Sequence, residues 1–434
     1  YYFSDGMAEE VRAALAALGS FHVVARTSSE MLRNADAVTA AHRLDVENVV
    51  TGSVRRSAST VRVNAQLVDG KDGLEQWSQS FDRPFGDVLQ IQSDIAANVA
   101  RALSARLGSG APTVAAIGGT SDPQAQDLLL QATASVGDDS NEAHLRRIAQ
   151  LTKATQLDPN YAQAFARLAV ENELWASTYA SNSAEKDAGE TKAIRAARRA
   201  IELAPNLALG HSALAVIYHN QLQMSRAFQE SQRSVTLPGA DSPIFFNHAL
   251  TLSQIGRQSE AETVAAQAIS LDPLNAVARA VQARILFFGR RYPESLDAGR
   301  RALLINTENT LARSVMGWDL LMLNRLDEAR RMFETLPADD YRRIVGLAAI
   351  AVRLKRRGAA VAALDAIHKR YGDAANYQIA QIYAQLGELD NGGAALQAAW
   401  EKRDSGLASM RVDPFIDPLR KDARYRAIAS RVFG

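Results

Sequence analysis

Apolar positions in the first hundred residues follow two different periods. Over residues 7–18 they recur every three or four positions, and the same spacing returns over residues 88–103, which predicts a helix in each stretch. Residues 61–67 instead alternate between apolar and polar side chains. The turn sequence DGKDG follows at 69–73 and leads into the strand-like run EQWSQSF, so this part predicts an antiparallel hairpin. The pattern therefore predicts a small domain in which helices accompany a sheet.

Shorter segments complete this domain. Residues 21–25, FHVVA, and residues 49–54, VVTGSV, are rich in β-branched side chains and predict two further strands. Residues 27–32 begin with Thr27 and carry Glu30 three positions later, the capping-box spacing that predicts a helix start. Residues 38–44 predict another short helix.

Asp5 and Gly6 stand directly before the first helix. An aspartate there accepts hydrogen bonds from free backbone N–H groups and lies at the positive end of the helix dipole. The alternative roles are an anion or metal site or a catalytic acid, but no histidine, base or second carboxylate is placed to act with Asp5. We interpret it as a helix cap. Because no strand precedes this helix, we expect a first strand upstream of Tyr1.

From about residue 122 the chain repeats itself. Copies of one phrase lie at 153–159, 199–205, 233–239, 267–273 and 301–307, and the last four are about 34 residues apart. This is the period of repeats built from two packed helices. Small residues recur at the two places where such helices must approach closely. They are Ala215, Ala249, Ala283 and Gly317 on the first helix, and Ala193, Ala227, Ala261, Ser295 and Ala329 on the second.

These patterns divide the chain into four parts. Residues 1–107 are expected to form the α/β domain, with a mixed sheet, and the Gly-rich residues 108–121 a flexible linker. Residues 122–402 are expected to form about eight helical hairpins. Residues 403–434 form a tail whose last helix, from about Pro418, caps the open end of the array. The expected fold class is a small α/β domain followed by an all-α repeat superhelix.

Composition excludes some classes of function but does not identify one. The chain has 434 residues, and its 49 Lys+Arg against 48 Asp+Glu give a net charge of +1. That balance provides no general attraction to nucleic acid or anionic membranes. No run of some 18 apolar residues predicts a membrane helix. The absence of cysteine excludes disulfides and thiol catalysis and fits an oxidising compartment as well as the cytosol.

Catalytic and metal-binding patterns are not found in the sequence. It contains no phosphate-binding loop, no nucleophile elbow and no zinc-binding His-Glu-x-x-His. The seven histidines are scattered, and His211 and His219 would lie two helical turns apart, too far to share a metal. The basic run at 353–358 is best interpreted as a solvated helix end. We therefore expect no enzyme activity, no cofactor and no metal.

The remaining candidate is the inner surface of the repeat array. The first helix of each hairpin lines this concave groove, and alignment of the repeats places five residues there: His219, Phe246, Arg284, Phe287 and Trp318. One interpretation is a groove for a protein or peptide partner. The other is packing between repeats, which an apolar stripe at helical spacing more commonly indicates. The linker would also allow the first domain to fold back against the array.

Several motifs agree in order and spacing with known bacterial modules. YFSDGMAEEV, VVARTSS, RLDVENVVTGSVRRS, VRVNAQLVDGKDGLEQWSQSFDR and IQSDIAANVARAL resemble the TolB-N-terminal-like (FlgO-like) domain. The 34-residue phrases resemble tetratricopeptide repeats, and RVDPFIDPLRKDARYRAIASRVF resembles the tail of the same regulators. Such modules occur in the C-terminal sensory regions of class III adenylate cyclases and of CadC-like winged-helix regulators. In those relatives a strand of the form LPF precedes the Asp-Gly helix; it is absent here.

The resemblance implies a non-enzymatic sensory region of a bacterial signalling or transcription regulator. It would bind a protein or peptide, or a second copy of itself, and relay to an output domain upstream. The alternatives are part of a class III adenylate or guanylate cyclase whose catalytic domain lies outside this chain, and an envelope assembly scaffold. No nucleic acid is expected to bind through this region. A membrane helix upstream of Tyr1 would place the region in the periplasm; without one it would be cytoplasmic.

Overall fold

The computed structural model describes residues 8, 11–12, 15, 23–56, 60–84, 94–95, 98–99, 117–134, 140–180 and 182–434. The chain divides into two compact units. The first comprises residues 1–217, 232–244 and 270–274, and the second comprises residues 218–231, 245–269 and 275–434. Asp5, and most of the predicted helices at 7–18 and 88–103, lie outside the described residues.

Three antiparallel strands form the sheet of the first unit, in the order β1 (Asn48–Arg56), β2 (Thr60–Asp69) and β3 (Glu75–Pro84). Side chains along β2 alternate between buried and exposed, as the sequence pattern predicts. Val63 pairs with Phe81 across the sheet, and both are buried. Ile95 and Val99 join the same core. The predicted small domain of sheet and helices is confirmed, and every described strand is antiparallel.

Among the described residues, the short helices α2 (Arg26–Met31) and α3 (Ala37–Leu44) accompany the sheet. The predicted helix at 38–44 is confirmed, and Asp36 caps it by accepting a 2.8 Å hydrogen bond from the Thr39 N–H. The predicted capping box at Thr27 is wrong. The helix begins one residue earlier, its own flanking residues provide no side-chain cap, and Glu30 instead pairs with Arg26 at 2.6 Å.

The described part of the predicted strand at 21–25 is also not a strand. Residues 23–25 have no regular secondary structure. The N–H of Ala25 donates a 2.7 Å hydrogen bond to the carbonyl of Leu271, the last residue of a repeat helix.

Paired helices fill the rest of the chain, and among the described residues α5 to α20 make eight hairpins. The first helices of the pairs are α5 (Pro123–Ala134), α7 (Ala162–Thr178), α9 (Ala208–Asn220), α11 (Ser242–Gln254), α13 (Ala276–Phe288), α15 (Thr310–Met322), α17 (Tyr341–Arg353) and α19 (Asn376–Leu386). The second helices are α6 (Asn141–Leu157), α8 (Ser183–Leu203), α10 (Met224–Thr236), α12 (Gln258–Leu271), α14 (Tyr292–Ile305), α16 (Leu326–Glu334), α18 (Arg357–Tyr371) and α20 (Leu389–Glu401). A 3-10 turn, η2 (Gly372–Ala375), precedes α19.

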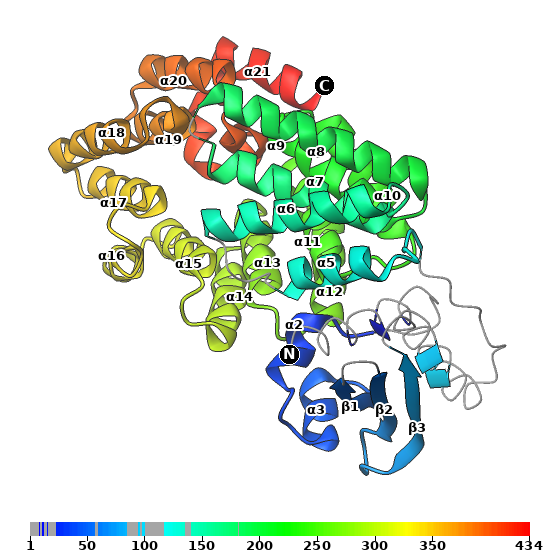
Figure 1. Cartoon of the computed structure of the whole chain (residues 1–434). Coiled ribbons are helices and arrows are strands. Elements are labelled where there is room, and N and C mark those ends of the chain that lie inside the picture. The colour runs from blue at the N-terminus through cyan, green and yellow to red at the C-terminus, as the bar shows by residue number, and fades with distance from the viewer. Residues whose placement is uncertain are drawn as a thin grey trace. The chain divides into compact units, whose positions relative to one another are not determined.

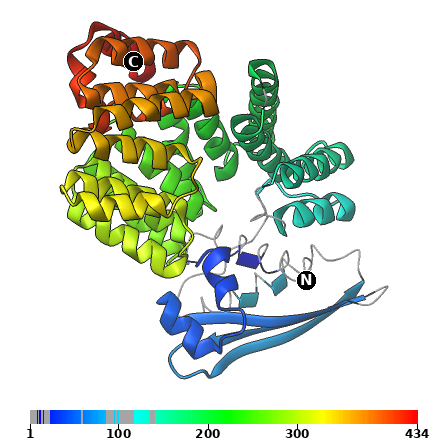
Figure 2. The same cartoon turned by 90° about the vertical axis from the view of Figure 1, so that its left-hand side faces the viewer.

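Within the second unit the hairpins from α13 to α20 stack in chain order, each first helix contacting the next (Figures 1 and 2). The predicted fold class, a small domain of sheet and helices followed by a repeat superhelix, is confirmed. At the end of the predicted linker, residues 117–121 are described, and the Gly118 carbonyl accepts a 3.0 Å hydrogen bond from the Gln163 N–H on α7.

The small residues that define the repeat lie where the sequence places them. Ala249, Ala261, Ala283, Ser295 and Ala329 are fully buried. The hydroxyl of Ser295 on α14 donates a 2.8 Å hydrogen bond to the Ala283 carbonyl on α13, which shows how closely the two helices approach. At Gly317, an added Cβ would lie 2.7 Å from the ring of Phe333. Larger side chains at these positions would separate the helices.

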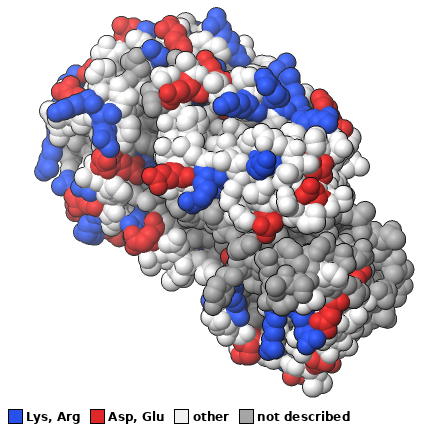
Figure 3. Space-filling model, in the orientation of Figure 1, with Lys and Arg blue, Asp and Glu red and all other residues white. Residues whose placement is uncertain are grey.

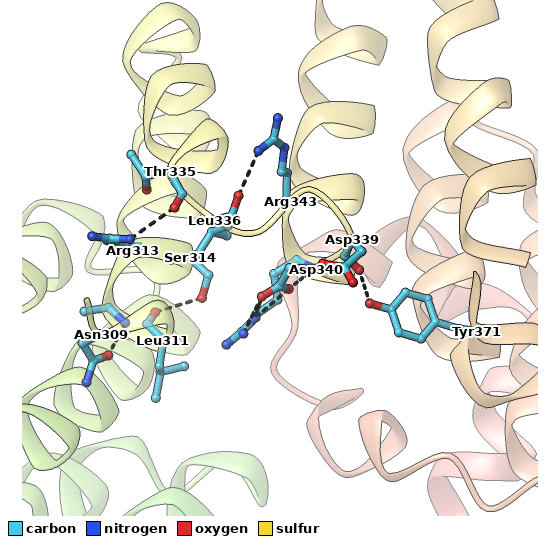
Figure 4. Close-up of polar contacts among 12 residues, drawn as sticks. Asn309, Leu311, Arg313, Ser314, Thr335, Leu336, Asp339, Asp340, Arg343 and Tyr371 are labelled. Atoms are coloured by element: carbon cyan, nitrogen blue, oxygen red, sulfur yellow. Dashed lines mark hydrogen bonds and ion pairs between the residues drawn. The ribbon is translucent and has the colours of Figure 1, made fainter. Parts of the chain in front are cut away.

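Helix α16 is the shortest described helix of the array, and arginines from the neighbouring helices donate hydrogen bonds to the carbonyl groups at its end (Figure 4). Its last carbonyls have no partner within the helix. Arg313 on α15 donates to the Thr335 carbonyl at 3.2 Å, and Arg343 on α17 donates to the Leu336 carbonyl at 2.8 Å. The Tyr371 hydroxyl donates to the Asp339 carbonyl in the same turn. These contacts hold together a unit that Pro337 closes earlier than the regular period.

The chain ends in two 3-10 helices, η3 (Ser405–Ser409) and η4 (Pro414–Lys421), and one α-helix, α21 (Ala423–Phe433). The final helix starts at Ala423, five residues after the predicted Pro418, because Asp422 caps it and Pro418 lies inside η4. Its apolar face, Tyr425, Ile428 and Val432, is buried as predicted. Helix α21 contacts α20, the last helix of the array.

Candidate partner-binding groove

The five predicted groove residues all lie on first helices of hairpins and all belong to the second unit. They are His219 on α9, Phe246 on α11, Arg284 and Phe287 on α13, and Trp318 on α15. The structure connects four of them, directly or through one intermediate residue, to the chain's own residues 404–421. We call residues 404–421, which contain η3 and η4, the C-terminal segment.

An aromatic cluster forms one part of this contact. The rings of Phe287 and Trp318 lie 5.7 Å apart. Phe415 of the C-terminal segment lies 6.2 Å from each of them, stacked on Phe287 and edge-on to Trp318. Phe415 is 3% exposed and Phe287 is 1% exposed. The aromatic surface that the sequence offers to a partner is therefore covered by Phe415.

A chain of polar contacts forms the other part. His219 Nε2 lies 2.9 Å from Gln254 Oε1, and the Gln254 amide donates a 3.1 Å hydrogen bond to the Ser409 hydroxyl. Arg284 donates to the same hydroxyl at 3.4 Å. Burial lowers the pKa of His219, and the nearby Arg284 cation acts in the same direction, while hydrogen bonds to Asn220 and Gln254 oppose the shift. The Nε2–H of His219 donates to Gln254 Oε1.

Phe246 does not take part in this contact. Its partly buried ring packs among Phe228, Ala249 and Leu250 on α10 and α11, which is packing between repeats. Its role in receiving a partner stays a prediction.

The C-terminal segment is held by a buried carboxylate that the sequence analysis missed. Asp413 accepts hydrogen bonds from the Tyr377 hydroxyl at 2.8 Å, from the Gln381 amide at 2.7 Å and from the Phe415 N–H at 2.9 Å. Burial raises the pKa of Asp413, and it raises the pKa of Tyr377 as well. The only sequence signal was the doubled Asp-Pro of RVDPFIDPL.

The C-terminal segment contributes large apolar side chains to the core. Its fully or almost fully buried apolar side chains are Leu407, Met410, Phe415, Ile416 and Leu419. Burying each such side chain contributes about 1.5–3 kcal/mol, so displacing the segment would cost on the order of 10 kcal/mol. A peptide binding at micromolar strength gains only about 8 kcal/mol. The role of the five residues in receiving a partner stays a prediction.

A second buried polar group lies in the first unit. Oε2 of Glu171 on α7 lies 2.9 Å from His144 Nδ1 and 3.0 Å from Arg147 Nε, and both of these residues are on α6. All three side chains are buried. The group ties the first two hairpins together, and the scattered spacing of its members gave no signal in the sequence.

The other charged features are those of a solvated surface. The run at 353–358 begins at the last residue of α17 and continues through the turn into the start of α18, where Arg357 pairs with Glu388. On the face shown in Figure 3, Lys and Arg occur together with Asp and Glu. Among the residues that the structure describes, no three metal-ligating side chains are grouped and no helix is long and apolar enough to cross a membrane.

Comparison with known proteins identifies the repeat. Residues 242–273, which contain α11 and α12, match the family model of the tetratricopeptide repeat. This hairpin is a tetratricopeptide repeat. The neighbouring hairpins share its 34-residue phrase and its small buried residues.

One relative is similar in sequence over part of the chain. A putative adenylate cyclase 3 from Rhizobium meliloti (strain 1021) is 30% identical over 171 residues, which are 39% of this chain and 29% of that protein. The chain thus spans less than a third of the length of this relative.

Three solved structures with similar folds are distant in sequence. The yeast Tom70 structure covers 71% of this chain and 67% of its own, with 15% identity and a TM-score of 0.43. A tetratricopeptide repeat protein from Parabacteroides merdae ATCC 43184 covers 61% of this chain and 98% of its own, with 11% identity and a TM-score of 0.44. YrrB, a TPR protein with an unusual peptide-binding site, covers 48% and 97%, with 15% identity and a TM-score of 0.33.

Proposed function

We propose that this chain is a non-enzymatic sensory and protein-interaction region of a bacterial signalling protein. The observation that carries the proposal is the stack of paired helices that contains a tetratricopeptide repeat at 242–273. Arrays of this type are scaffolds that bind protein or peptide partners. The partner class is therefore a protein or peptide, or a second copy of this chain, with no nucleic acid bound through this region.

The first domain supports the signalling part of the proposal. Its motifs resemble the TolB-N-terminal-like domain, which in bacterial regulators lies between an output domain and the repeats. We propose that the chain relays a binding event in the repeats to an output domain upstream, by a change in the curvature of the array or in dimer geometry. If a membrane helix precedes Tyr1, this region is periplasmic; the cytoplasm is the alternative.

The likeness to the putative adenylate cyclase favours a second candidate, that the whole protein is a class III nucleotide cyclase. In that case catalysis belongs to a domain outside this chain. A winged-helix regulator and an envelope scaffold are the remaining alternatives. The sequence upstream of Tyr1 distinguishes all three.

The test compares the natural full-length protein with this chain alone. We expect cyclic-nucleotide synthesis, if the protein has it, only from the full-length form. Activity from residues 1–434 by themselves would overturn the non-enzymatic proposal. Light scattering and affinity capture followed by crosslinking test the interaction: recovery of neither a partner nor a dimer would count against it.

A variant locates the binding surface. Phe415→Ala removes the aromatic ring that covers Phe287 and Trp318. A partner recovered equally by the wild type and by a folded Phe415→Ala protein binds outside the groove. A partner recovered only by the variant would show that the C-terminal segment blocks the predicted site.

A further inference from the structure

Helix α2 takes its missing cap from a residue far away in the chain. Its flanking residue Ala25 provides no side-chain cap. Instead, the carboxylate of Asp272 accepts hydrogen bonds from the Ser28 N–H, at 3.0 Å, and from the Ser28 hydroxyl. Both side chains are almost completely buried, at 0% and 1% exposure. Both residues belong to the first compact unit.

Neighbouring contacts extend this joint. The hydroxyl of Ser28 accepts a 2.8 Å hydrogen bond from the Leu274 N–H, and the Leu271 carbonyl accepts one of 2.7 Å from the Ala25 N–H. The side chain of Leu274 packs against a cluster formed by Leu32 and residues of α3. Hydrogen bonds and apolar contacts thus come from the same turn, residues 271–274.

The same position makes a different hydrogen bond one repeat later. Asn306 occupies the place of Asp272 one repeat later, and its side chain accepts a 2.9 Å hydrogen bond from the Glu308 N–H within its own turn. In an earlier repeat Asp158 accepts from the Asn160 N–H of its own turn and also from the Thr120 hydroxyl, which lies before α5. After Asp272, Asn275 caps α13 by accepting from the N–H groups of residues 277 and 278.

We propose that the turn at 271–274 is the docking surface for the chain's own first domain and that Asp272 is its recognition residue. The partner surface is the start of α2, with Ser28 inserted between the carboxylate and the Leu274 N–H. This contact lies within the chain, and it does not depend on the proposed signalling function.

Hydrogen exchange of the full chain tests the proposal. Asp272→Ala removes the acceptor, so the Ser28 amide is expected to exchange at least roughly tenfold faster. Asn306→Ala is the matched control at the same repeat position and leaves the Ser28 amide unchanged. Amides of β2 report that the sheet remains folded. An unchanged Ser28 amide in Asp272→Ala would overturn the proposal, whatever the outcome of the interaction tests.

A crosslink tests the same contact independently of stability. The chain has no cysteine, so an introduced pair reacts without competition. Disulfides need Cα atoms within about 7 Å, and the Ala25–Leu271 hydrogen bond brings these backbones together. We expect Ala25→Cys with Leu271→Cys to oxidise readily and to shift on a non-reducing gel. Ala25→Cys with Ile305→Cys, one repeat further, is the control; equal oxidation of both pairs, or of neither, would contradict the docking.

Discussion

The Ser295 hydroxyl lies 2.7 Å from Oδ2 of Asp319, in a place where neither side chain reaches water. Burial raises the pKa of Asp319 to about 8, although the hydrogen bond from Ser295 opposes the shift. At neutral pH the carboxyl therefore carries a proton, which it donates to Ser295 while Ser295 donates to the Ala283 carbonyl. Three consecutive helices, α13, α14 and α15, are joined by this chain of hydrogen bonds.

The first prediction concerns the pH dependence of that contact. The folded pKa of Asp319 is above the unfolded value, so its contribution to stability is fully present below about pH 4 and is lost as the pH rises towards 8. The loss reaches up to about 1.4 kcal/mol per pH unit. Asp319→Asn keeps a donor for Ser295 and cannot ionise. We expect equal melting temperatures at pH 4.5 and a growing advantage of the variant up to pH 8.

Asp297→Asn is the control for this measurement. Asp297 is exposed on α14 and pairs with Arg301, so its replacement leaves the pH profile of stability unchanged. If the gap between Asp319→Asn and the wild type is the same at both ends of the pH range, Asp319 is ionised in the fold and this account is wrong.

The second prediction concerns the C-terminal segment. Phe415→Ala leaves a cavity beside Phe287 and Trp318, and the cost to the free energy of unfolding is expected to be about 3–5 kcal/mol. Urea denaturation measures the loss, and the emission of Trp318 should shift to longer wavelength as water enters. Leu304→Ala removes a side chain that is 86% exposed and should change little. A neutral Phe415→Ala variant would mean that the segment does not cover the groove.

The third prediction uses two glycines on the two helices of one hairpin. An added Cβ at Gly346 on α17 would lie 2.4 Å from the buried ring of Phe333, whereas one at Gly358 on α18 would meet nothing within 4 Å. Gly346→Ala should therefore destabilise the fold by about 1–3 kcal/mol. Gly358→Ala should be neutral or stabilise it by up to about 1 kcal/mol, because alanine favours the helix.

A rescue experiment identifies the cause of the Gly346 effect. Combining Gly346→Ala with Phe333→Leu shortens the side chain that the new methyl group meets. The double variant should lose less stability than the sum of the two single changes. Additive losses would show that Phe333 is not the neighbour that requires glycine.

The fourth prediction concerns the arginines that complete α16 (Figure 4). Arg343→Met keeps most of the apolar stem but removes the hydrogen bonds to the Leu336 and Glu334 carbonyls. We expect a loss of about 1 kcal/mol in thermal unfolding and faster amide exchange at the α16–α17 turn. Arg353→Met, an exposed arginine at the other end of α17, is the control. Equal effects of the two changes would argue against a specific role for Arg343.

The repeat array could be predicted from the sequence because its signal is local and periodic. Ala261 and Ser295 recur at positions where a larger side chain would push two helices apart, so their identity reports a contact that every hairpin makes. The alternation of apolar and polar side chains along β2 could also be predicted, because one face of the strand is buried. The predicted helix start was wrong where a distant residue provides the cap. The sequence pattern suggested Thr27 as the cap of this helix, but the Ser28 N–H donates to Asp272.

The repeat pattern predicted the position of the groove residues but not what covers them. The repeat alignment placed Phe287 and Trp318 correctly on the first helices, but a periodic pattern carries no information about what lies opposite. Phe415 follows the last repeat and has no counterpart in the period. Its contact with the groove depends on the path that the chain takes after α20.

The sequence by itself determined the paired helices, their period and the small residues at their crossings, because these follow from spacing within about thirty-four residues. Only the tertiary structure decided that the C-terminal segment covers the aromatic groove, that Asp272 turns towards Ser28 and that Asp319 keeps its proton. Each of these depends on burial produced by segments distant in the chain. Burial of that kind changes hydrogen-bond partners and pKa values without changing the local pattern.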